Sequence, residues 1–131
     1  MVKCRVEGWT DGRYRSFVFS QIRAGMRRYP PKFQCLKNAK RGKKVNEATG
    51  RQAEHYECNG CNKHFPQKQV QVDHIKPVVD PRKGFVDWNT YIDRMYCSIK
   101  NFQVLCKGCH LKKTKFEKTM RKNSNVDNKK T

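Results

Sequence analysis

Two Cys-x2-Cys pairs are the residues of this chain best suited to chemistry. They are Cys58 with Cys61 and Cys106 with Cys109, and 44 residues separate the two pairs. Each such pair can place two thiolate sulfurs on one tetrahedral metal ion, about 2.3 Å from a zinc ion. Four thiolates leave no open coordination position, so the pattern predicts a structural zinc site and not a catalytic one. A chance occurrence and two separate redox pairs are the alternatives.

Three cysteines lie outside these pairs, and an odd total of seven argues against a fully paired disulfide framework. We expect the three to be buried or free thiols: Cys4, Cys35 and Cys97.

A second set of polar residues lies between and just after the cysteine pairs. Asp73 and His74 fall in a segment, 70–75, where apolar and polar residues alternate as in a strand. Asn101 opens a further extended segment, and His110 directly follows the last zinc cysteine. Phosphodiester hydrolysis needs a base to activate water and positive charge on the phosphate. Histidine is suited to the role of the base, and a carboxylate with an imidazole can hold a divalent ion.

The order of these residues resembles that of the HNH endonuclease family. The residues of the family name match His74, Asn101 and His110, and the resemblance covers roughly residues 56–116. It implies a ββα-metal core, also called the His-Me finger, and a divalent ion such as Mg2+, Mn2+ or Ni2+. In the family, the counterparts of Asp73 and His110 bind this ion. The counterpart of His74 activates water, and that of Asn101 orients the His74 segment through hydrogen bonds across the strand pair.

Each of these residues also has an ordinary structural interpretation. Asp73 and His74 would then form an ion pair on a hairpin, Asn101 would be a turn or strand-end residue, and His110 would serve the zinc loop. Adjacent strand residues point to opposite sides, so joint action of Asp73 and His74 requires a bend at the strand end.

The long stretch between His74 and Asn101 departs from the family pattern. We interpret it as an insertion that holds a helix from Trp88 to about Tyr96, with Asp87 as its N-cap. Its apolar stripe, which we expect to be core, consists of Trp88, Tyr91, Ile92 and Met95.

Two other histidines, His55 and His64, are predicted to be surface residues or secondary DNA contacts. Four thiolates already complete the predicted zinc site, so neither histidine is needed there.

The charge of the chain is strongly positive and uneven. Its 131 residues carry 30 Lys and Arg against 11 Asp and Glu, a net charge of +19. The net charge is +10 over residues 1–50, +3 over 51–110 and +6 over 111–131. Such an excess points to a polyanion partner, with nucleic acid first and an anionic membrane surface second. No apolar run is long enough to span a membrane and no apolar leader opens the chain, so we expect a cytoplasmic protein.

The basic residues supply the expected phosphate contacts, which act by releasing counterions from DNA. A solvated basic face is the alternative. The expected contacts are Arg23, Arg27, Arg28, Lys40, Arg41, Lys43 and Lys44 near the N-terminus, and Lys112, Lys113 and Lys115 near the C-terminus.

The predicted fold class is small α+β, with a ββα-metal core, a four-cysteine zinc site and a basic, partly helical N-terminal extension. The predicted units are the extension at 1–50, the nuclease domain at 51–122 and a disordered basic tail at 123–131. Further predicted elements are helices at 16–28, 32–39 and 107–122, an extended segment at 101–105, and a loop or arm at 40–44.

The predicted function is that of a metal-dependent DNA endonuclease that nicks double-stranded DNA with weak sequence preference. The resemblance implies a 5′-phosphate and a 3′-hydroxyl product. It is to phage-type members, which also implies a place beside terminase or other packaging proteins in the host cytoplasm. A monomer and a weak homodimer are both compatible with the sequence. The alternatives are a non-catalytic zinc module that binds nucleic acid or a partner protein, and an RNA nuclease.

Overall fold

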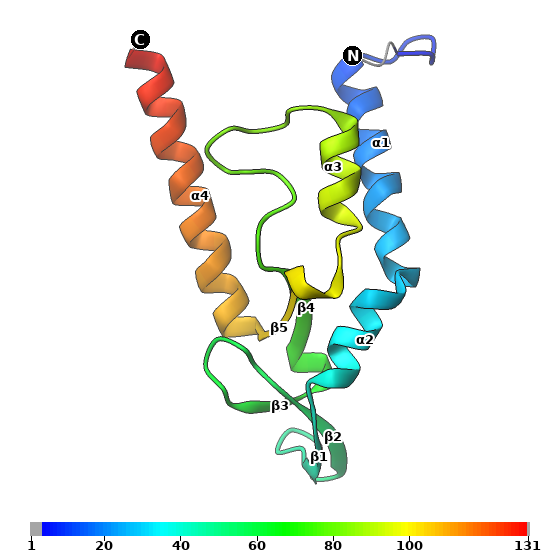
Figure 1. Ribbon diagram of the computed structural model, residues 1–131, viewed down its shortest axis with the longest axis vertical. Coiled ribbons are helices and arrows are strands. Elements are labelled where there is room, and N and C mark those ends of the chain that lie inside the picture. The colour runs from blue at the N-terminus through cyan, green and yellow to red at the C-terminus, as the bar shows by residue number, and fades with distance from the viewer. Residues whose placement is uncertain (1–3, 131) are drawn as a thin grey trace.

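The computed structural model describes residues 4–130, with side chains described as far as Asn123. This part of the chain forms four α-helices and two small antiparallel sheets, so the predicted small α+β class is confirmed (Figure 1). The helices are α1 (Asp11–Ala24), α2 (Pro30–Asn38), α3 (Trp88–Met95) and α4 (Lys107–Lys130), with 3-10 turns at Gly25–Arg28, Gln67–Gln69 and Ile99–Asn101. The strands are β1 (Lys40–Val45), β2 (Gln52–Glu57), β3 (His64–Pro66), β4 (Val70–His74) and β5 (Phe102–Cys106).

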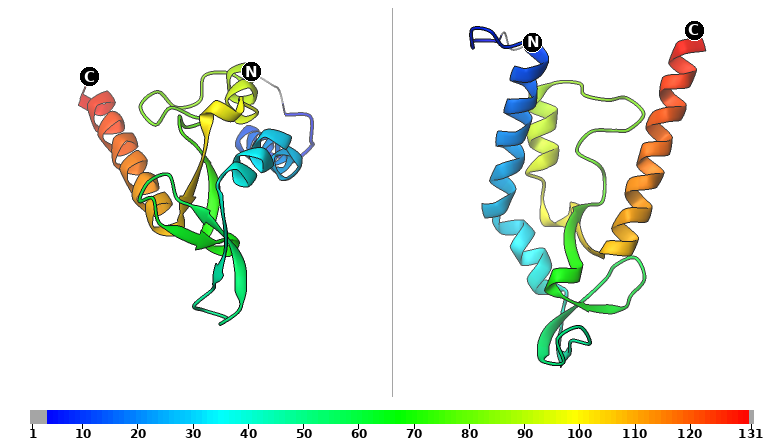
Figure 2. Two further views of the ribbon diagram at one scale, coloured as in Figure 1. Left: turned by 60° about the horizontal axis from the view of Figure 1, so that its bottom comes forward. Right: turned by 180° about the vertical axis from the view of Figure 1, so that it is seen from behind.

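The β4–β5 pair positions the candidate site. The two strands are antiparallel, with Asp73 opposite Gln103 and His74 opposite Phe102. Both extended segments agree with the sequence prediction. Strand β5 runs directly into α4, so the chain order here is strand, strand and helix, with α3 inserted between the strands. Viewed from either side, α4 stands apart from α1 and α3, and the connection from 75 to 87 runs between them (Figure 2).

The segment 40–44 was predicted to be a loop or arm, and this prediction is wrong. It forms β1, the edge strand of the sheet ordered β1-β2-β3. All of its side chains are exposed, so it carries no alternation of apolar and polar residues that could reveal a strand. Backbone pairing with β2 makes the strand, and Lys43 lies opposite Glu54, a favourable pair of opposite charges. Strand β3 was also missed, because three residues are too few to show a pattern.

The N-terminal helices differ from the prediction at their ends. Helix α1 begins at Asp11 and not at 16, because the Thr10 hydroxyl accepts a hydrogen bond of 3.1 Å from the Arg13 N–H and caps the helix. It ends at Ala24, and the four residues that follow form a 3-10 turn. The two prolines, Pro30 and Pro31, lie in the first turn of α2, where their missing N–H groups have no helical partner to lose.

The C-terminal helix is longer than predicted. It continues through Lys130, whereas a disordered tail was predicted from 123 onwards. Residues 109–130 contain no Gly or Pro, so nothing in the sequence breaks the helix. Thr131 lies outside the described residues.

Aromatic packing fastens the N-terminal helices to the inserted helix. Asp87 caps α3 as predicted, and its Oδ1 accepts a hydrogen bond of 2.7 Å from the Thr90 N–H. Phe19 of α1 packs on Trp88 and Tyr91 of α3, with ring centroids 4.8 Å apart in both pairs. Met95 is also buried, as predicted. Ile92 is not part of this core, because 40% of its surface is exposed.

One close approach ties the turn after α1 to the end of α3. The Tyr96 hydroxyl donates a hydrogen bond to the Ile22 carbonyl. A Cβ atom on Gly25 would overlap this hydroxyl, so only glycine fits there. The Tyr29 hydroxyl donates a second bond, of 2.7 Å, to the Cys97 carbonyl. The N-terminal extension is therefore packed on the insertion.

Candidate functional site

The four cysteines of the two Cys-x2-Cys pairs converge as the sequence predicted. Their sulfur atoms, on Cys58, Cys61, Cys106 and Cys109, all lie within 4.8 Å of one another. A tetrahedron with zinc–sulfur bonds of about 2.3 Å has sulfur–sulfur edges of about 3.8 Å. The Cys61 and Cys106 sulfurs are 3.9 Å apart, which fits such a tetrahedron. The donor set therefore suits a structural metal ion such as zinc.

Backbone N–H groups surround these sulfurs, as thiolates require. Gly60 N–H and Cys106 N–H each donate to the Cys58 sulfur at 3.3 Å, and Cys109 N–H donates to the Cys106 sulfur at 3.4 Å. Burial of the Cys58 thiol opposes its ionisation, but these donors prevail and lower its pKa to about 6. The hydrogen bonds that Cys109 donates to the sulfurs of Cys106 and Cys58 raise its pKa to about 12. The cluster alone thus favours one thiolate, at Cys58, and opposes ionisation of Cys109, so a bound cation would be needed to balance four thiolates.

The two Cys-x2-Cys turns, 58–61 and 106–109, approach each other closely at Gly60. A Cβ there would lie 3.0 Å from the Cys109 sulfur and 3.1 Å from the Cys109 Cβ. Asn62 adopts a positive φ of 61°, a region that asparagine tolerates better than most residues. Its N–H donates a hydrogen bond of 2.8 Å to the Cys58 carbonyl, which closes the turn that holds Cys58 and Cys61.

Asp73 of β4 and His110 of α4 face each other, as the family resemblance implies. His110 Nε2 lies 3.8 Å from Asp73 Oδ1. Two ligand atoms that are each about 2.1 Å from one metal ion can be at most about 4.2 Å apart, so this spacing is compatible with a shared divalent ion. Among residues 4–123, however, no third His, Cys, Asp or Glu completes a metal cluster here.

The other carboxylate oxygen of Asp73 is bound by protein groups. Lys113 Nζ lies 2.5 Å from Asp73 Oδ2 and also donates to the His74 carbonyl. Gln103 Nε2 donates to the same oxygen at 3.3 Å. The Lys113 ammonium is also 3.6 Å from Glu117. Lys113 therefore lies at the centre of the candidate site and is paired with Asp73, whereas the sequence analysis gave it the role of a DNA phosphate contact.

The sequence analysis did not single out Glu117 or Gln103, the two other residues in contact with Lys113 or Asp73. The Glu117 contact has a recognisable signal, because Glu117 and Lys113 are four apart on one helix. The Gln103 contact follows only from the register of β4 with β5.

The His74 ring lies on another side of the strand. Its Nε2 is 2.8 Å from the Met95 carbonyl, and its ring centroid is 4.9 Å from that of Phe102. A carbonyl can only accept a hydrogen bond, so Nε2 must carry the proton. In the neutral ring Nδ1 then has a free lone pair, and it has no hydrogen-bond partner in the described part of the chain. The structure does not bring the His74 ring into contact with Asp73 or His110.

Asn101 bridges the segment that follows His74. Its Oδ1 accepts a hydrogen bond of 3.0 Å from the Lys76 N–H, and its backbone carbonyl accepts one of 2.7 Å from the Ile75 N–H. Its Nδ2 also donates to the Cys97 sulfur at 3.7 Å. These bonds hold the chain just after His74 against the start of β5.

The other two histidines take no part in either site. His55 was predicted to lie at the surface, and this is wrong. It is 6% exposed, since it lies on the inward side of β2, and its Nδ1 bonds the Ala53 carbonyl at 2.8 Å. His64 is partly exposed and contacts Lys44 and Glu57.

The other expected DNA contacts are exposed, which leaves them available to phosphates. They are Arg23, Arg27, Arg28, Lys40, Arg41, Lys43, Lys44, Lys112 and Lys115. One of them, Arg41, is held by a salt bridge of 3.0 Å to Glu57.

The three remaining cysteines are partly buried and form no disulfide, so they are free thiols as expected. Burial raises the pKa of the Cys35 thiol. The Cys4 thiol donates weakly to the Val6 and Trp9 carbonyls.

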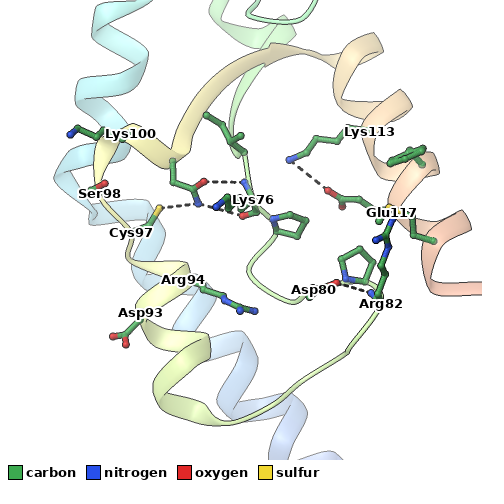
Figure 3. A pocket seen from close by; sticks show the side chains of 16 residues that line it. Lys76, Asp80, Arg82, Asp93, Arg94, Cys97, Ser98, Lys100, Lys113 and Glu117 are labelled. Carbon is green, nitrogen blue, oxygen red and sulfur yellow. Dashed lines mark hydrogen bonds and ion pairs between the residues drawn. The ribbon is translucent and has the colours of Figure 1, made fainter. Parts of the chain in front are cut away.

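A pocket of about 840 Å³ adjoins the candidate site (Figure 3). Its walls include Ile75 and Lys76 directly after His74, Asn101, and the face of α4 that carries Lys113 and Glu117. Asp73, His74 and His110 are outside its lining, so the pocket is a neighbour of the candidate site.

Comparison of the chain with models of protein families, with curated proteins and with solved structures finds no match. In the described residues no helix has the length and apolar character needed to cross a membrane.

Proposed function

We propose that this protein is a metal-dependent DNA endonuclease of the HNH type. The observation that carries the proposal is the contact between β4 and α4, where Asp73 Oδ1 and His110 Nε2 are 3.8 Å apart. His74 adjoins Asp73 at the end of β4, and Asn101 braces the chain that follows. These are the residues that the family resemblance selected from the sequence.

In this proposal Asp73 and His110 hold a divalent ion, whose charge stabilises the phosphate as negative charge builds up on it. His74 is the general base. Its Nε2 proton is fixed on the Met95 carbonyl, so Nδ1 accepts a proton from water. The hydroxide oxygen bonds to phosphorus, the bond from phosphorus to the 3′-oxygen breaks, and the 3′-oxygen takes up a proton from solvent water. The products are a 5′-phosphate and a 3′-hydroxyl, and the protein supplies no covalent intermediate.

The basic surface supplies sequence-independent affinity in this proposal. A net charge of +19 favours binding to the DNA backbone, and contacts to phosphates carry no sequence information. We therefore expect nicking of double-stranded DNA with weak sequence preference. The four-cysteine site holds zinc and stabilises the fold without taking part in the reaction.

One observation favours a second candidate, a non-catalytic zinc module that binds nucleic acid. The Lys113 ammonium already neutralises Asp73, which leaves one carboxylate oxygen for a metal ion. In that case Asp73 and Lys113 are a structural ion pair beside His110.

A plasmid-nicking assay distinguishes the two candidates. The zinc-bound protein is incubated with supercoiled plasmid and Mg2+, Mn2+ or Ni2+, with and without chelator. The nuclease predicts metal-dependent conversion to open circles, which Asp73→Asn abolishes. Asp11→Asn is the matched control, because Asp11 is an exposed aspartate at the start of α1, outside both the candidate site and the pocket beside it, and its replacement should leave the rate unchanged. Nicking that survives Asp73→Asn at the full rate would contradict the proposal, and binding without nicking would favour the second candidate.

A further inference from the structure

The pocket beside the candidate site has an apolar wall that the protein itself does not cover. Phe116 and Met120 of α4 lie four residues apart on one face of the helix and both line the pocket. Phe116 is 65% exposed, although four of its eight neighbours in residues 112–120 are lysine. An exposed aromatic ring that lines a pocket offers an apolar face that a ligand can cover.

Basic side chains from separate elements reach the same pocket. Arg94 extends from α3 toward its centre, Lys113 extends from α4, and Lys76 lies between them (Figure 3). Neither Lys76 nor Arg94 has a salt-bridge partner in the described part of the chain, whereas Lys113 is paired with Asp73 and Glu117.

The acidic residues of the lining do not cancel this charge. The Asp93 carboxylate points away from the centre (Figure 3). Glu117 is paired with Lys113. Asp80 keeps its charge and accepts a hydrogen bond of 2.8 Å from the Arg82 backbone N–H, but the lining holds five basic residues against three acidic ones. The pocket therefore combines an aromatic face with positive charge, which is the chemistry that binds a nucleotide.

The pocket is also linked to the candidate active site through backbone contacts. Asn101 holds the Lys76 backbone, two residues after His74. Lys113 lines the pocket and contacts both Asp73 and the His74 carbonyl. A strand whose phosphate lies at an ion held by Asp73 and His110 would thus pass close to the pocket.

We propose that this pocket binds one unpaired nucleotide of the DNA strand, next to the phosphate that is cut. This inference rests on the proposed nuclease function. The base lies against Phe116, and the phosphate that joins it to the next nucleotide contacts Lys76 and Arg94. A base exposes its face to an aromatic side chain only when it leaves the duplex stack. The volume of about 840 Å³ is within the range of about 300–1,000 Å³ typical of clefts that hold small ligands. The protein therefore prefers DNA with a bulge or an unpaired base over a fully paired duplex.

The test compares two DNA probes on the zinc-bound full chain, without added Mg2+, Mn2+ or Ni2+. One probe is a paired duplex, and the other carries a single bulged 2-aminopurine. Anisotropy gives the two dissociation constants, and quenching of 2-aminopurine fluorescence reports stacking of the base. One stacked base is worth about fivefold to 150-fold in affinity. Phe116→Ala should remove most of the preference for the bulge and the quenching, and Arg94→Gln should lower the preference.

Three control variants separate the pocket from general binding. Leu111→Ala removes another exposed apolar side chain of α4, which lies outside the pocket, and should leave the preference unchanged. Arg28→Gln removes an exposed charge that is not part of the pocket lining and should weaken both probes equally. His74→Ala should leave the preference intact, because the base of the reaction is not part of the lining.

Equal preference for the bulge and equal quenching in wild type and Phe116→Ala would overturn the proposal. Tighter binding of an RNA version of the bulged probe than of the DNA version would also overturn it. A cleavage assay with added metal ion is run in parallel. A bulge preference that depends on Phe116, together with no cleavage in any metal, would refute the nuclease function and keep the pocket. Cleavage without a Phe116-dependent preference would refute the pocket and keep the nuclease.

Discussion

Replacing His74 with alanine separates catalysis from binding more sharply than any other single change. The imidazole is the only group that the proposal assigns to activating water, so its loss should remove general-base catalysis. Such catalysis is typically worth about 10²–10⁴ in rate, which corresponds to about 3–5 kcal/mol of transition-state stabilisation. DNA affinity should change little, because it depends mainly on lysine and arginine.

The same substitution also has a structural cost that the local contacts define. It removes the hydrogen bond to the Met95 carbonyl, worth about 0.5–1.5 kcal/mol, and the ring contact with Phe102, worth a similar amount. We therefore expect a free energy of unfolding lower by about 1–3 kcal/mol. Most small domains remain folded at 25 °C after such a loss, since they start from about 5–15 kcal/mol.

The assay measures the nicking rate at saturating DNA, the dissociation constant by anisotropy and the melting temperature. His64→Ala is the matched control, because His64 is a partly exposed histidine on β3 outside the candidate site. It should keep the wild-type rate. Imidazole added to the buffer should partly restore nicking by His74→Ala, which a purely structural defect would not allow. Nicking by His74→Ala at the wild-type rate would refute the assignment of the base.

Three further predictions concern the elements that hold the site in place. Cys109→Ser should abolish zinc binding and unfold the β5–α4 junction, because the binding energy of a structural zinc is folding energy. Zinc content and circular dichroism measure these two effects. Full zinc content with an unchanged melting temperature would contradict the prediction. Gly25→Ala should lower the free energy of unfolding by several kcal/mol, because the new Cβ would overlap the Tyr96 hydroxyl. An unchanged midpoint of denaturant unfolding would show that the turn shifts to make room for the Cβ at no cost. Asp87→Ala should lower the melting temperature at pH 7, because the Thr90 N–H bonded to Asp87 loses its acceptor. That hydrogen bond also holds the pKa of the Asp87 carboxyl below its usual range. The stabilisation that the bond provides is therefore present above a pH of about 3.9 and is lost as the pH falls further. A difference in melting temperature between wild type and Asp87→Ala that does not narrow at low pH would contradict this.

Local features of the structure were predictable from the sequence. The Cys-x2-Cys turns and the Asp87 cap each depend on a few neighbouring residues, and both are found where the sequence placed them. The alternation in β4 was also readable, because one face of that strand is half-buried. The start of α1 depends equally on a local cap, Thr10, which the spacing of apolar residues does not reveal.

Features that depend on distant residues were not predictable. Strand β1 has no buried side chain, so only its pairing with β2 defines it. The ion pair between Asp73 and Lys113 joins residues 40 positions apart, and the inward position of His55 depends on the orientation of a sheet that the sequence did not reveal. A pattern within one segment cannot report which partner the rest of the chain will bring to it.

The proposed nuclease has two metal sites with different tasks. One exchangeable divalent ion at Asp73 and His110 supports cleavage, and a separate zinc ion stabilises the fold. The most direct measurement is stepwise chelation, with metal content by mass spectrometry and nicking rate followed together for wild type and His110→Ala. Four thiolates should retain zinc under mild chelation, whereas two mixed ligands should not retain their ion. We predict that wild-type nicking stops while one zinc per chain and the folded circular dichroism spectrum remain, and that added Mg2+, Mn2+ or Ni2+ restores it. His110→Ala should keep its zinc and require much more added metal for rescue. Loss of nicking and of the tightly held zinc in the same step, in both proteins, would contradict the two-site account.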